Sequence, residues 1–332
     1  MNYIKCGLIY KPDSSKDWMH EYAAPMAPIA LEDRIRIFIT PRSRQSSTGV
    51  YNAYITFIDC DKHDPSRVLY VHDKPLIEYG QPGTFDEHGT TAIEILQHEG
   101  KYYLYYLGWQ RTETTPYVVR MGIAVSDDGM NFEKMSEGPY VGVSPYVPYG
   151  IGDIHIIKED GKFHMWYTHY LPWLKTAKGY RPTYDLRYAW SDNGLDWKFG
   201  PVCINCRLTK EAIASPTVLK KNGQYHMWYC YRPEIDEMGN SGPYRIGYAV
   251  ADNYTDWTRD DASVSMELSP EGWDSEMMCY PKVLECSGKV YLFYGGNFYG
   301  RDGLGYAEVD MNVDKARTNA SGEVVTSESN VL

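Results

Sequence analysis

Several features that would place the chain in common functional classes are missing from its sequence. No run of 18 apolar residues occurs, which argues against a transmembrane helix, and the start Met1-Asn-Tyr-Ile-Lys5 lacks the basic and apolar segments of a signal peptide. The formal net charge of −11 argues against nucleic acid and anionic membrane surfaces as partners. No stretch shows a convincing 3.6-residue apolar period, which favours an all-β fold. We therefore expect a cytoplasmic, all-β protein.

Cysteine is scarce and odd in number. Most of the seven cysteines lie in strand-like runs, which indicates reduced, buried thiols in a cytoplasmic protein. Cys203-Ile-Asn-Cys206 has the spacing of a metal or redox pair, but no second pair and no nearby histidine completes a zinc set. We predict neither a metal nor a cofactor, with chemistry at this pair as the alternative.

Aromatic residues are plentiful, and they recur in one phrase. The full copies begin at glycines 61, 62 and 65 residues apart and span Gly100–Tyr106, Gly161–Tyr167, Gly223–Tyr229 and Gly288–Tyr294. A weaker copy, Asp33–Ile39, precedes them. Five units of one period indicate a repeat architecture.

A second phrase follows the aromatic one in most units. It is apolar and ends in Asp or Asn with Gly, in the segments Met121–Gly129, Leu186–Gly194 and Ile246–Asn253, and in a truncated last copy, Leu304–Val309. Short aromatic and β-branched runs bounded by Gly, Asp and Asn are typical of strands joined by hairpins. Four antiparallel strands per unit, A to D, predict a five-bladed β-propeller.

The two ends of the repeat region suggest how the ring closes. The fifth unit stops after its third strand near Val309, and a strand-like run at Tyr3–Tyr10 has no repeat of its own. We predict that this run completes the fifth blade, which would remove an exposed sheet edge; a separate edge strand is the alternative. The domain prediction is a propeller over 1–310 and a polar, partly disordered tail over 311–332.

One face of such a propeller collects the starts of the inner A strands and the B–C loops, and a ligand pocket is expected there. The Asp-Asp-Gly turns lie on the other face and are interpreted as turn formers. The residues eight positions before each turn glycine mark the inner-strand starts: Pro25, Ala92, Asp153, Ser215 and Tyr280. Asp153, beside two glycines in Gly150-Ile-Gly-Asp-Ile-His155, is predicted to point into the channel mouth.

Acidic residues recur four positions earlier in three of the units. The positions are Glu21, His88, Tyr149, Glu211 and Glu276. Carboxylates that converge on a pocket could supply the acid and the base or nucleophile that glycosidic cleavage needs. The alternative for each is a solvated surface acid. We take Asp153, Glu21, Glu211 and Glu276 as candidate catalytic residues.

Aromatic residues, arginines, histidines and an asparagine near the same face suit a polyhydroxylated ligand. The candidate substrate-binding residues are Arg42, His88, Trp109, Arg111, His155, His169, Arg232, Asn297, Tyr299 and Arg301. Several arginines in so acidic a chain suggest an anionic group, because the guanidinium fork matches carboxylate and phosphate. The alternative is that these arginines pair with the glutamates.

With these features the chain resembles the five-bladed propeller glycosidases of glycoside hydrolase families 43 and 32. The resemblance covers about residues 3–310. The segments Tyr106–Trp109, Met227–Arg232 and Gly272–Met277 are similar to glycosidase-like proteins of bacterial surface-polysaccharide gene clusters.

The resemblance implies a role for each acid. Such enzymes carry an Asp base on the first blade, a supporting Asp on the third and a Glu acid on the fourth. Asp153 matches the third-blade residue and Glu211 loosely the fourth, with Glu276 as the alternative acid. The first blade has Ala24-Pro25 in place of the base, with Glu21 nearby.

Two functional hypotheses follow. The first is an intracellular enzyme that cleaves or transfers a glycosyl unit, on an acidic sugar in one version, with a small-molecule or oligosaccharide substrate in the central channel. The second is a non-hydrolytic sugar or nucleotide-sugar binding or biosynthetic protein, which the missing first-blade Asp favours. A lyase acting on an acidic sugar is a third reading.

Overall fold

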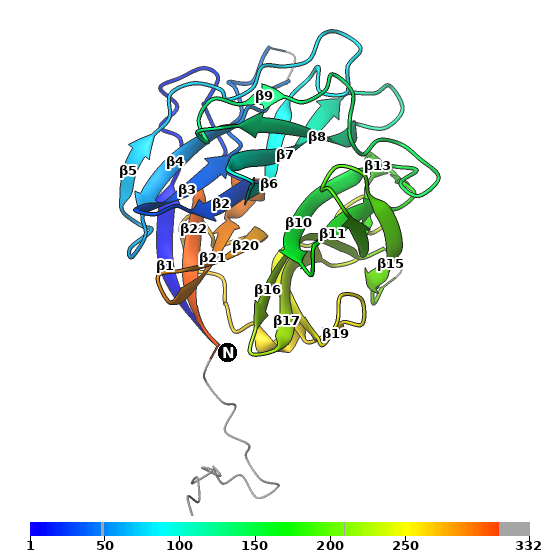
Figure 1. The fold of residues 1–332 in the computed structure, drawn as a ribbon. Coiled ribbons are helices and arrows are strands. Elements are labelled where there is room, and N and C mark those ends of the chain that lie inside the picture. Colours follow the sequence, from blue (N-terminus) through cyan, green and yellow to red (C-terminus); the bar gives the residue numbers. More distant parts are fainter. Residues whose placement is uncertain (48–49, 209, 312–332) are drawn as a thin grey trace, which may run out of the picture.

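Five four-stranded antiparallel sheets surround a central axis in the computed structural model, which describes residues 1–47, 50–208 and 210–311 (Figure 1). Four sheets, blades I to IV, are each continuous in sequence. Blade I contains β2–β5 (Met26–Ala30, Arg34–Ile39, Thr56–Asp61, Val68–Val71), and blade II contains β6–β9 (Thr90–His98, Lys101–Gln110, Val118–Ser126, Glu133–Lys134). Blade III contains β10, β11, β14 and β15 (Ile151–Glu159, Lys162–Tyr170, Tyr184–Ser191, Lys198–Ile204), and blade IV contains β16–β19 (Ala212–Lys221, Gln224–Arg232, Arg245–Ala251, Thr258–Arg259). The prediction of an all-β, five-bladed propeller is confirmed.

Blade V joins the two ends of the propeller. It contains β20 (Cys279–Cys286), β21 (Lys289–Gly295), β22 (Leu304–Asp310) and, as its outer strand, β1 (Asn2–Tyr10). Tyr3 pairs with Val309 in this antiparallel ladder. The predicted closure is therefore confirmed. Apart from Met311, the predicted tail lies outside the described residues.

The repeated turn glycine has a geometric cause. In blade II, Glu99 and Gly100 link β6 to β7, and both have positive φ, at 50° and 77°. The same pair of positive φ values recurs at Asn222 and Gly223. Two positive φ values define the hairpin turn whose twist matches that of its strands, and glycine adopts such angles without strain.

The other predicted turns also have a structural role. Asp128 Oδ1 accepts hydrogen bonds from the backbone nitrogens of Met130 and Asn131, each at 2.8 Å. These and related hydrogen bonds lower the pKa of Asp128. This carboxylate organises its turn, as the sequence predicts.

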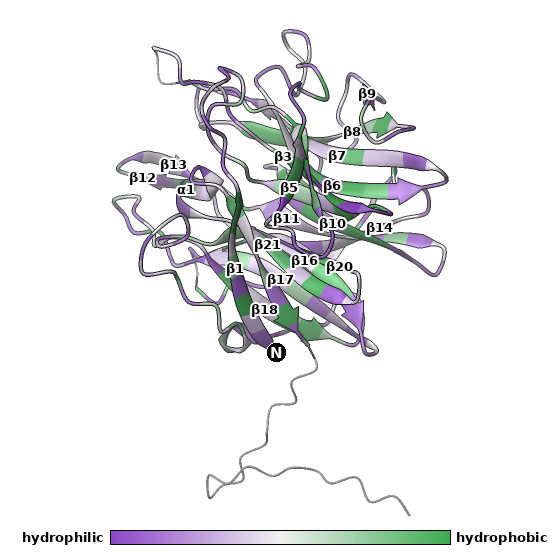
Figure 2. Ribbon diagram, turned by 90° about the vertical axis from the view of Figure 1, so that its left-hand side faces the viewer, coloured by the Kyte–Doolittle hydropathy of each residue, from purple (hydrophilic) through white to green (hydrophobic). Residues whose placement is uncertain are grey.

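Apolar side chains fill the space between neighbouring blades. Trp166 and Trp228 are fully buried, and each indole nitrogen donates a hydrogen bond, to the Tyr254 carbonyl and to the Tyr3 hydroxyl respectively, both at 2.9 Å. Figure 2 shows hydrophobic residues concentrated in the strands and polar residues in many of the connecting loops. The long central strands thus build the core and leave the loops free to form a site.

An inserted hairpin and two short helical segments interrupt the regular repeat of strands. A short hairpin, β12 (Leu174–Thr176) and β13 (Gly179–Arg181), is inserted between β11 and β14. Helical structure in the described part of the chain is limited to η1 (Asp261–Ser263) and α1 (Asn297–Gly300). None of the described helices is long and apolar enough to cross a membrane.

Candidate functional site

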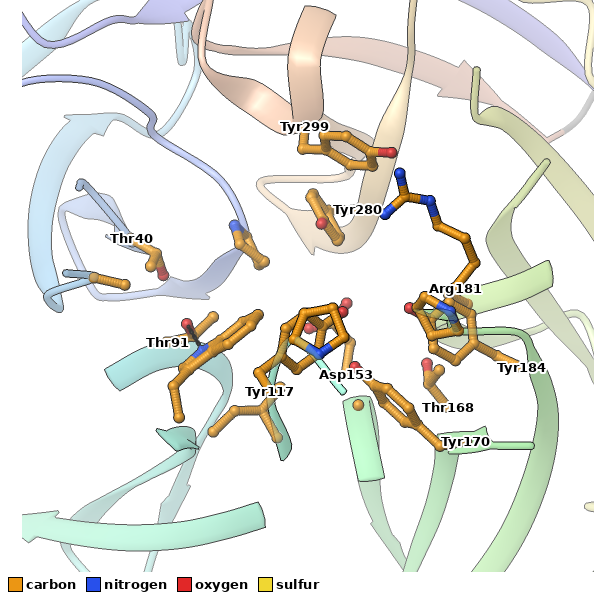
Figure 3. Close-up of a pocket in the computed structure, with 18 of the residues that line it drawn as sticks. Thr40, Thr91, Tyr117, Asp153, Thr168, Tyr170, Arg181, Tyr184, Tyr280 and Tyr299 are labelled. Atoms are coloured by element: carbon orange, nitrogen blue, oxygen red, sulfur yellow. Dashed lines mark hydrogen bonds between the residues drawn. The ribbon is translucent and has the colours of Figure 1, made fainter. Parts of the chain in front are cut away.

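A cavity of about 930 Å³ opens at one end of the central axis, where all five blades contribute inner-strand starts and B–C loops (Figure 3). Most of its polar lining consists of tyrosines, threonines and arginines. Asp153 is the only carboxylate among the described residues that line it. This composition differs from the predicted ring of acids.

Backbone bulges determine what the inner strands present to the cavity. The β10–β11 ladder is interrupted between Ile151 and Ile154, so that Gly152 and Asp153 leave the regular register. Bulges of this kind redirect side chains beside functional sites. A Cβ atom on Gly152 would lie 2.9 Å from the Cβ of Thr168, so the glycine allows the close approach of the two strands. The local sequence thereby aims Asp153 at the cavity.

Asp153 is buried, and its surroundings make ionisation of the carboxyl less favourable than in water. Its side chain is 7% exposed, and the Ser215 hydroxyl donates a hydrogen bond to Oδ2. Burial raises the pKa of the Asp153 carboxyl, while the hydrogen bond from Ser215 and the positive charge of Lys282 oppose that rise. A buried carboxyl with a raised pKa is suited to donate a proton.

A charged network that sequence reasoning missed lies on the inner strands beside Asp153. Glu94 Oε2 lies 2.9 Å from His155 Nδ1 and 3.5 Å from Lys282 Nζ. Lys282 also donates to the carbonyls of Ile93 and Ile154, at 2.5 and 2.6 Å, and so joins three blades. His155 therefore belongs to this network, and it is absent from the cavity lining.

The three predicted glutamates do not line the cavity. Glu211 is buried and forms a two-pronged ion pair with Arg259, at 2.8 and 3.1 Å. Glu276 is exposed, and Glu21 pairs by backbone hydrogen bonds with Arg42. These positions give no support to the catalytic roles predicted for them.

Two further candidates serve other purposes. His169 is buried with Nδ1 3.2 Å from Asp185 Oδ1. Asn297 Oδ1 accepts hydrogen bonds from the backbone nitrogens of Glu276 and Met277, at 2.7 and 3.0 Å. His169 thus connects two neighbouring strands and Asn297 stabilises the backbone before β20, and neither side chain lines the cavity.

The remaining candidates do line the cavity. They are Arg42, His88, Trp109, Arg111, Arg232, Tyr299 and Arg301. Trp109 donates from Nε1 to Thr91 Oγ1 at 2.8 Å and packs against Tyr117, with ring centroids 4.6 Å apart. These rings offer an apolar platform with polar edges, which suits a sugar.

The Arg42 guanidinium contacts two rings, 3.9 Å from the Tyr22 centroid and 4.9 Å from that of Tyr51. Arg111 donates to the Tyr51 carbonyl at 3.1 Å and to Asn52 Oδ1 at 2.8 Å. Neither arginine forms an ion pair with a described carboxylate. Their positive charges therefore face the cavity unneutralised. The alternative in which they pair with the predicted glutamates finds no support in these contacts.

Sequence reasoning also missed part of the opposite wall. Arg181, on the inserted hairpin, and Tyr117, Tyr170, Tyr184 and Tyr244 line the cavity as well. Burial raises the pKa of Tyr170, Tyr184 and Tyr244 well above its ordinary value, so these hydroxyls are neutral donors. The aromatic content predicted stacking surfaces but not which tyrosines provide them.

No cluster of three or more His, Cys, Asp or Glu side chains suited to a metal ion occurs in the described part of the chain. Cys203 and Cys206 are free thiols, and burial raises the pKa of both. A raised thiol pKa lowers the population of the reactive thiolate.

Comparisons with known proteins agree with this architecture. No protein-family model matches the chain. The uncharacterized protein Rv1502 of Mycobacterium tuberculosis is 29% identical over 313 residues, which cover 93% of this chain and 100% of that protein. A β-1,2-mannobiose phosphorylase of a Thermoanaerobacter species is 26% identical over 180 residues, covering 51% of this chain and 56% of the enzyme.

Solved structures share the fold at low identity. A structure from work on the GH130 family of mannoside phosphorylases, which contains hydrolases targeting β-1,2 mannosidic linkages in Candida mannan, superposes with a TM-score of 0.71 at 14% identity. The match covers 93% of this chain and 94% of that one. The chain is thus a five-bladed propeller of the type found in glycoside hydrolases and glycoside phosphorylases.

Proposed function

We propose that the protein transfers a glycosyl unit from a glycoside to inorganic phosphate, with Asp153 as the proton donor. The observation that carries the proposal is the make-up of the cavity: one buried carboxylate faces several arginines that have no close carboxylate partner. Among the five arginines of the lining, only Arg301 has a described carboxylate nearby, with Asp302 Oδ1 at 4.0 Å from its Nε.

Hydrolysis by the common two-carboxylate route needs an acid for the leaving oxygen and a second carboxylate as base or nucleophile. The described lining supplies one carboxylate. Phosphate is already an anion near neutral pH and can attack the sugar without a base, provided that cationic groups hold it. Arginine is well suited to this task because its planar fork matches phosphate oxygens.

We assign the phosphate to Arg42, which lines the cavity and forms no ion pair with a described carboxylate. The hydroxyl of Tyr280, which lines the cavity beside Asp153, senses both charges: burial raises its pKa, the Asp153 charge adds to that rise and the Arg42 charge opposes it. Asp153 and Arg42 therefore act on one small region of the cavity. Acid and acceptor anion would meet there at the anomeric carbon.

The proposed step balances as follows. A phosphate oxygen forms a bond to the anomeric carbon while the bond from that carbon to the leaving oxygen breaks. The leaving oxygen takes the proton of the Asp153 carboxyl. A proton from dihydrogen phosphate then returns to Asp153, and the products are a sugar 1-phosphate and the released sugar.

The relatives support this choice. One relative is a β-1,2-mannobiose phosphorylase, and a similar structure comes from a family described as mannoside phosphorylases that also contains hydrolases. β-1,2-Mannobiose is therefore the first probe, within a panel of disaccharides.

The test is product analysis with and without phosphate. Wild type should form a sugar 1-phosphate, and Asp153→Asn should slow the reaction by about 10²–10⁴-fold, the usual contribution of a general acid. Asp127→Asn, at an exposed turn far from the cavity, is the matched control and should keep full activity. Release of reducing sugar that does not depend on phosphate would establish hydrolysis. Tight sugar binding without turnover across the panel would favour the binding-protein hypothesis.

A further inference from the structure

Arg232 at the end of β17 is a buried cation without a counter-ion among the described residues. Its side chain lines the cavity and is 6% exposed. The guanidinium donates to the carbonyl of Pro182 and, at 3.4 Å, to Ser241 Oγ, and its Nε has no hydrogen-bond partner. Its nearest aromatic contact is Tyr244, whose ring centroid lies 5.6 Å away.

Such a charge is unfavourable unless something neutralises it. Removing an ion from water carries a penalty of several kcal/mol that is normally offset by an opposite charge and a full set of hydrogen bonds. Arg232 has neutral partners and one unused donor. An anionic ligand in the cavity would supply both missing elements.

Arg181 is a second unpaired cation on the same side. It is placed by the hairpin β12–β13, and no described residue forms a hydrogen bond or ion pair with its guanidinium. In Figure 3 its side chain extends toward Tyr299. Arg232 donates a hydrogen bond to the carbonyl of Pro182, the residue that follows Arg181, and both arginines line the cavity.

This pair is separate from the arginines near blades I and V. The Arg42 guanidinium lies 3.9 Å from the Tyr22 ring centroid, and the Arg301 guanidinium lies 3.9 Å from that of Phe298. Figure 3 shows Asp153 between Thr40, two residues before Arg42, and Arg181 on the other side. The acid thus lies between two cationic regions.

We propose that Arg232 and Arg181 form a second anion subsite, which binds an acidic group on the sugar substrate itself. The inference rests on the proposed function, in which phosphate occupies the Arg42 side. The shared chemistry is an anionic substituent, either a carboxylate as in a uronic acid or a phosphate monoester. Tyr184 and Tyr244 contribute neutral hydroxyls that hydrogen-bond the rest of that sugar.

Calorimetric titration tests this subsite without turnover. The probes are matched sets of methyl hexoside, methyl hexuronoside and hexose 6-phosphate, in the manno and gluco series, and inorganic phosphate alone. Wild type should bind at least one acidic probe tenfold or more tightly than its neutral match. The uronoside and 6-phosphate arms distinguish a carboxylate from a phosphate ester.

The variants separate the two subsites. Arg181→Gln and Arg232→Gln should each reduce the preference for the acidic probe by about tenfold to a hundredfold, equivalent to losing one charge-assisted hydrogen bond, and should leave the affinity for inorganic phosphate unchanged. Arg42→Gln should do the reverse. Because no described residue forms a hydrogen bond or ion pair with the Arg181 guanidinium, its variant remains informative if Arg232→Gln fails to fold.

Equal affinity for acidic and neutral probes in both series would overturn the second subsite, as would loss of the preference in Arg42→Gln alone. A different result would overturn the proposed function. Inorganic phosphate would then bind neither to wild type nor to the Arg181 and Arg232 variants, whether or not acidic sugars bind more tightly than neutral ones.

Discussion

The hydroxyl of Ser215 on blade IV donates a hydrogen bond to the buried Oδ2 atom of Asp153 on blade III. Ser215 has a φ of 57°, and its backbone nitrogen donates to Thr168 Oγ1 at 2.9 Å, so the serine is held in its bulge. The acid of the proposed reaction is thus oriented by a neighbouring blade.

Ser215→Ala should therefore shift the pH profile of the reaction. The hydrogen bond favours the charged form of Asp153 and lowers its pKa, so its loss should raise that pKa. The reaction needs the protonated acid, and the falling limb of the rate profile should move to higher pH. The measurement is kcat/KM against pH, with Ser136→Ala, at an exposed loop, as control. An unmoved limb would remove Ser215 from the proton-donating unit.

The raised pKa of Asp153 also predicts how the free energy of unfolding depends on pH. Its folded pKa is raised above the ordinary value of 3.8, so the folded state holds this proton more tightly than the unfolded state does. The penalty for ionising the group is absent below that ordinary value and grows as pH rises through the folded pKa. Asp153→Asn, which cannot ionise, should be more stable than wild type at pH 7, and the difference should shrink toward pH 4. Urea unfolding at both pH values measures it; a wild type that is the more stable at pH 7 would contradict the prediction.

Lys282→Met should affect both stability and the acid. It leaves the buried Glu94 carboxylate without the lysine charge, and breaking a buried pair typically lowers the free energy of unfolding by about 3–5 kcal/mol. Removing the lysine charge should also raise the pKa of Asp153 and move the falling limb of activity to higher pH. Lys158→Met, at an exposed position near the end of β10, is the control. A purely structural lysine would change stability without moving the pH limb.

The closing strand β1 forms an ion pair with a buried aspartate that precedes β20. Lys5 Nζ on β1 lies 2.6 Å from Asp274 Oδ2, and the Asp274 side chain is 1% exposed. Lys5→Met leaves this carboxylate without its cation and should lower the free energy of unfolding by about 3–5 kcal/mol. Lys11→Met breaks an exposed pair with Asp302 and should change it by about 1 kcal/mol or less. Equal effects in denaturant unfolding would show that the buried pair is unimportant for closure.

Local patterns in the sequence predicted the hairpins and inner strands of the propeller. The turn glycines predicted the hairpins, and counting back from them located Asp153, Ser215 and Tyr280 at the inner-strand starts. Counting four residues further back selected Glu211, whose partner Arg259 lies 48 residues away. Spacing within a repeat predicts how far along its strand a residue lies, and so how close it is to the cavity end. It does not reveal whether an arginine or lysine from another segment already forms an ion pair with that residue.

The missed residues have a common cause. Lys282 and Glu94 meet His155, which was predicted to bind substrate, only because three inner strands converge. Each of the two looks like an ordinary strand residue in its own blade. Arg181 lies on an inserted hairpin that breaks the repeat, so no equivalent position pointed to it. Considering every arginine in the B–C connections, including the inserted segments, would have identified Arg181.

The measurement that bears most directly on the proposed function is the dependence of the reaction rate on phosphate concentration. The account predicts that the rate rises from near zero and saturates, with sugar 1-phosphate as the product. In Arg42→Gln the KM for phosphate should rise by about tenfold to a hundredfold, since a charge-assisted contact is lost. Arg44→Gln, which removes an exposed arginine paired with Asp17, should leave it unchanged. A glycoside-cleaving rate that is already maximal without phosphate, in wild type and in Arg42→Gln alike, would contradict the account.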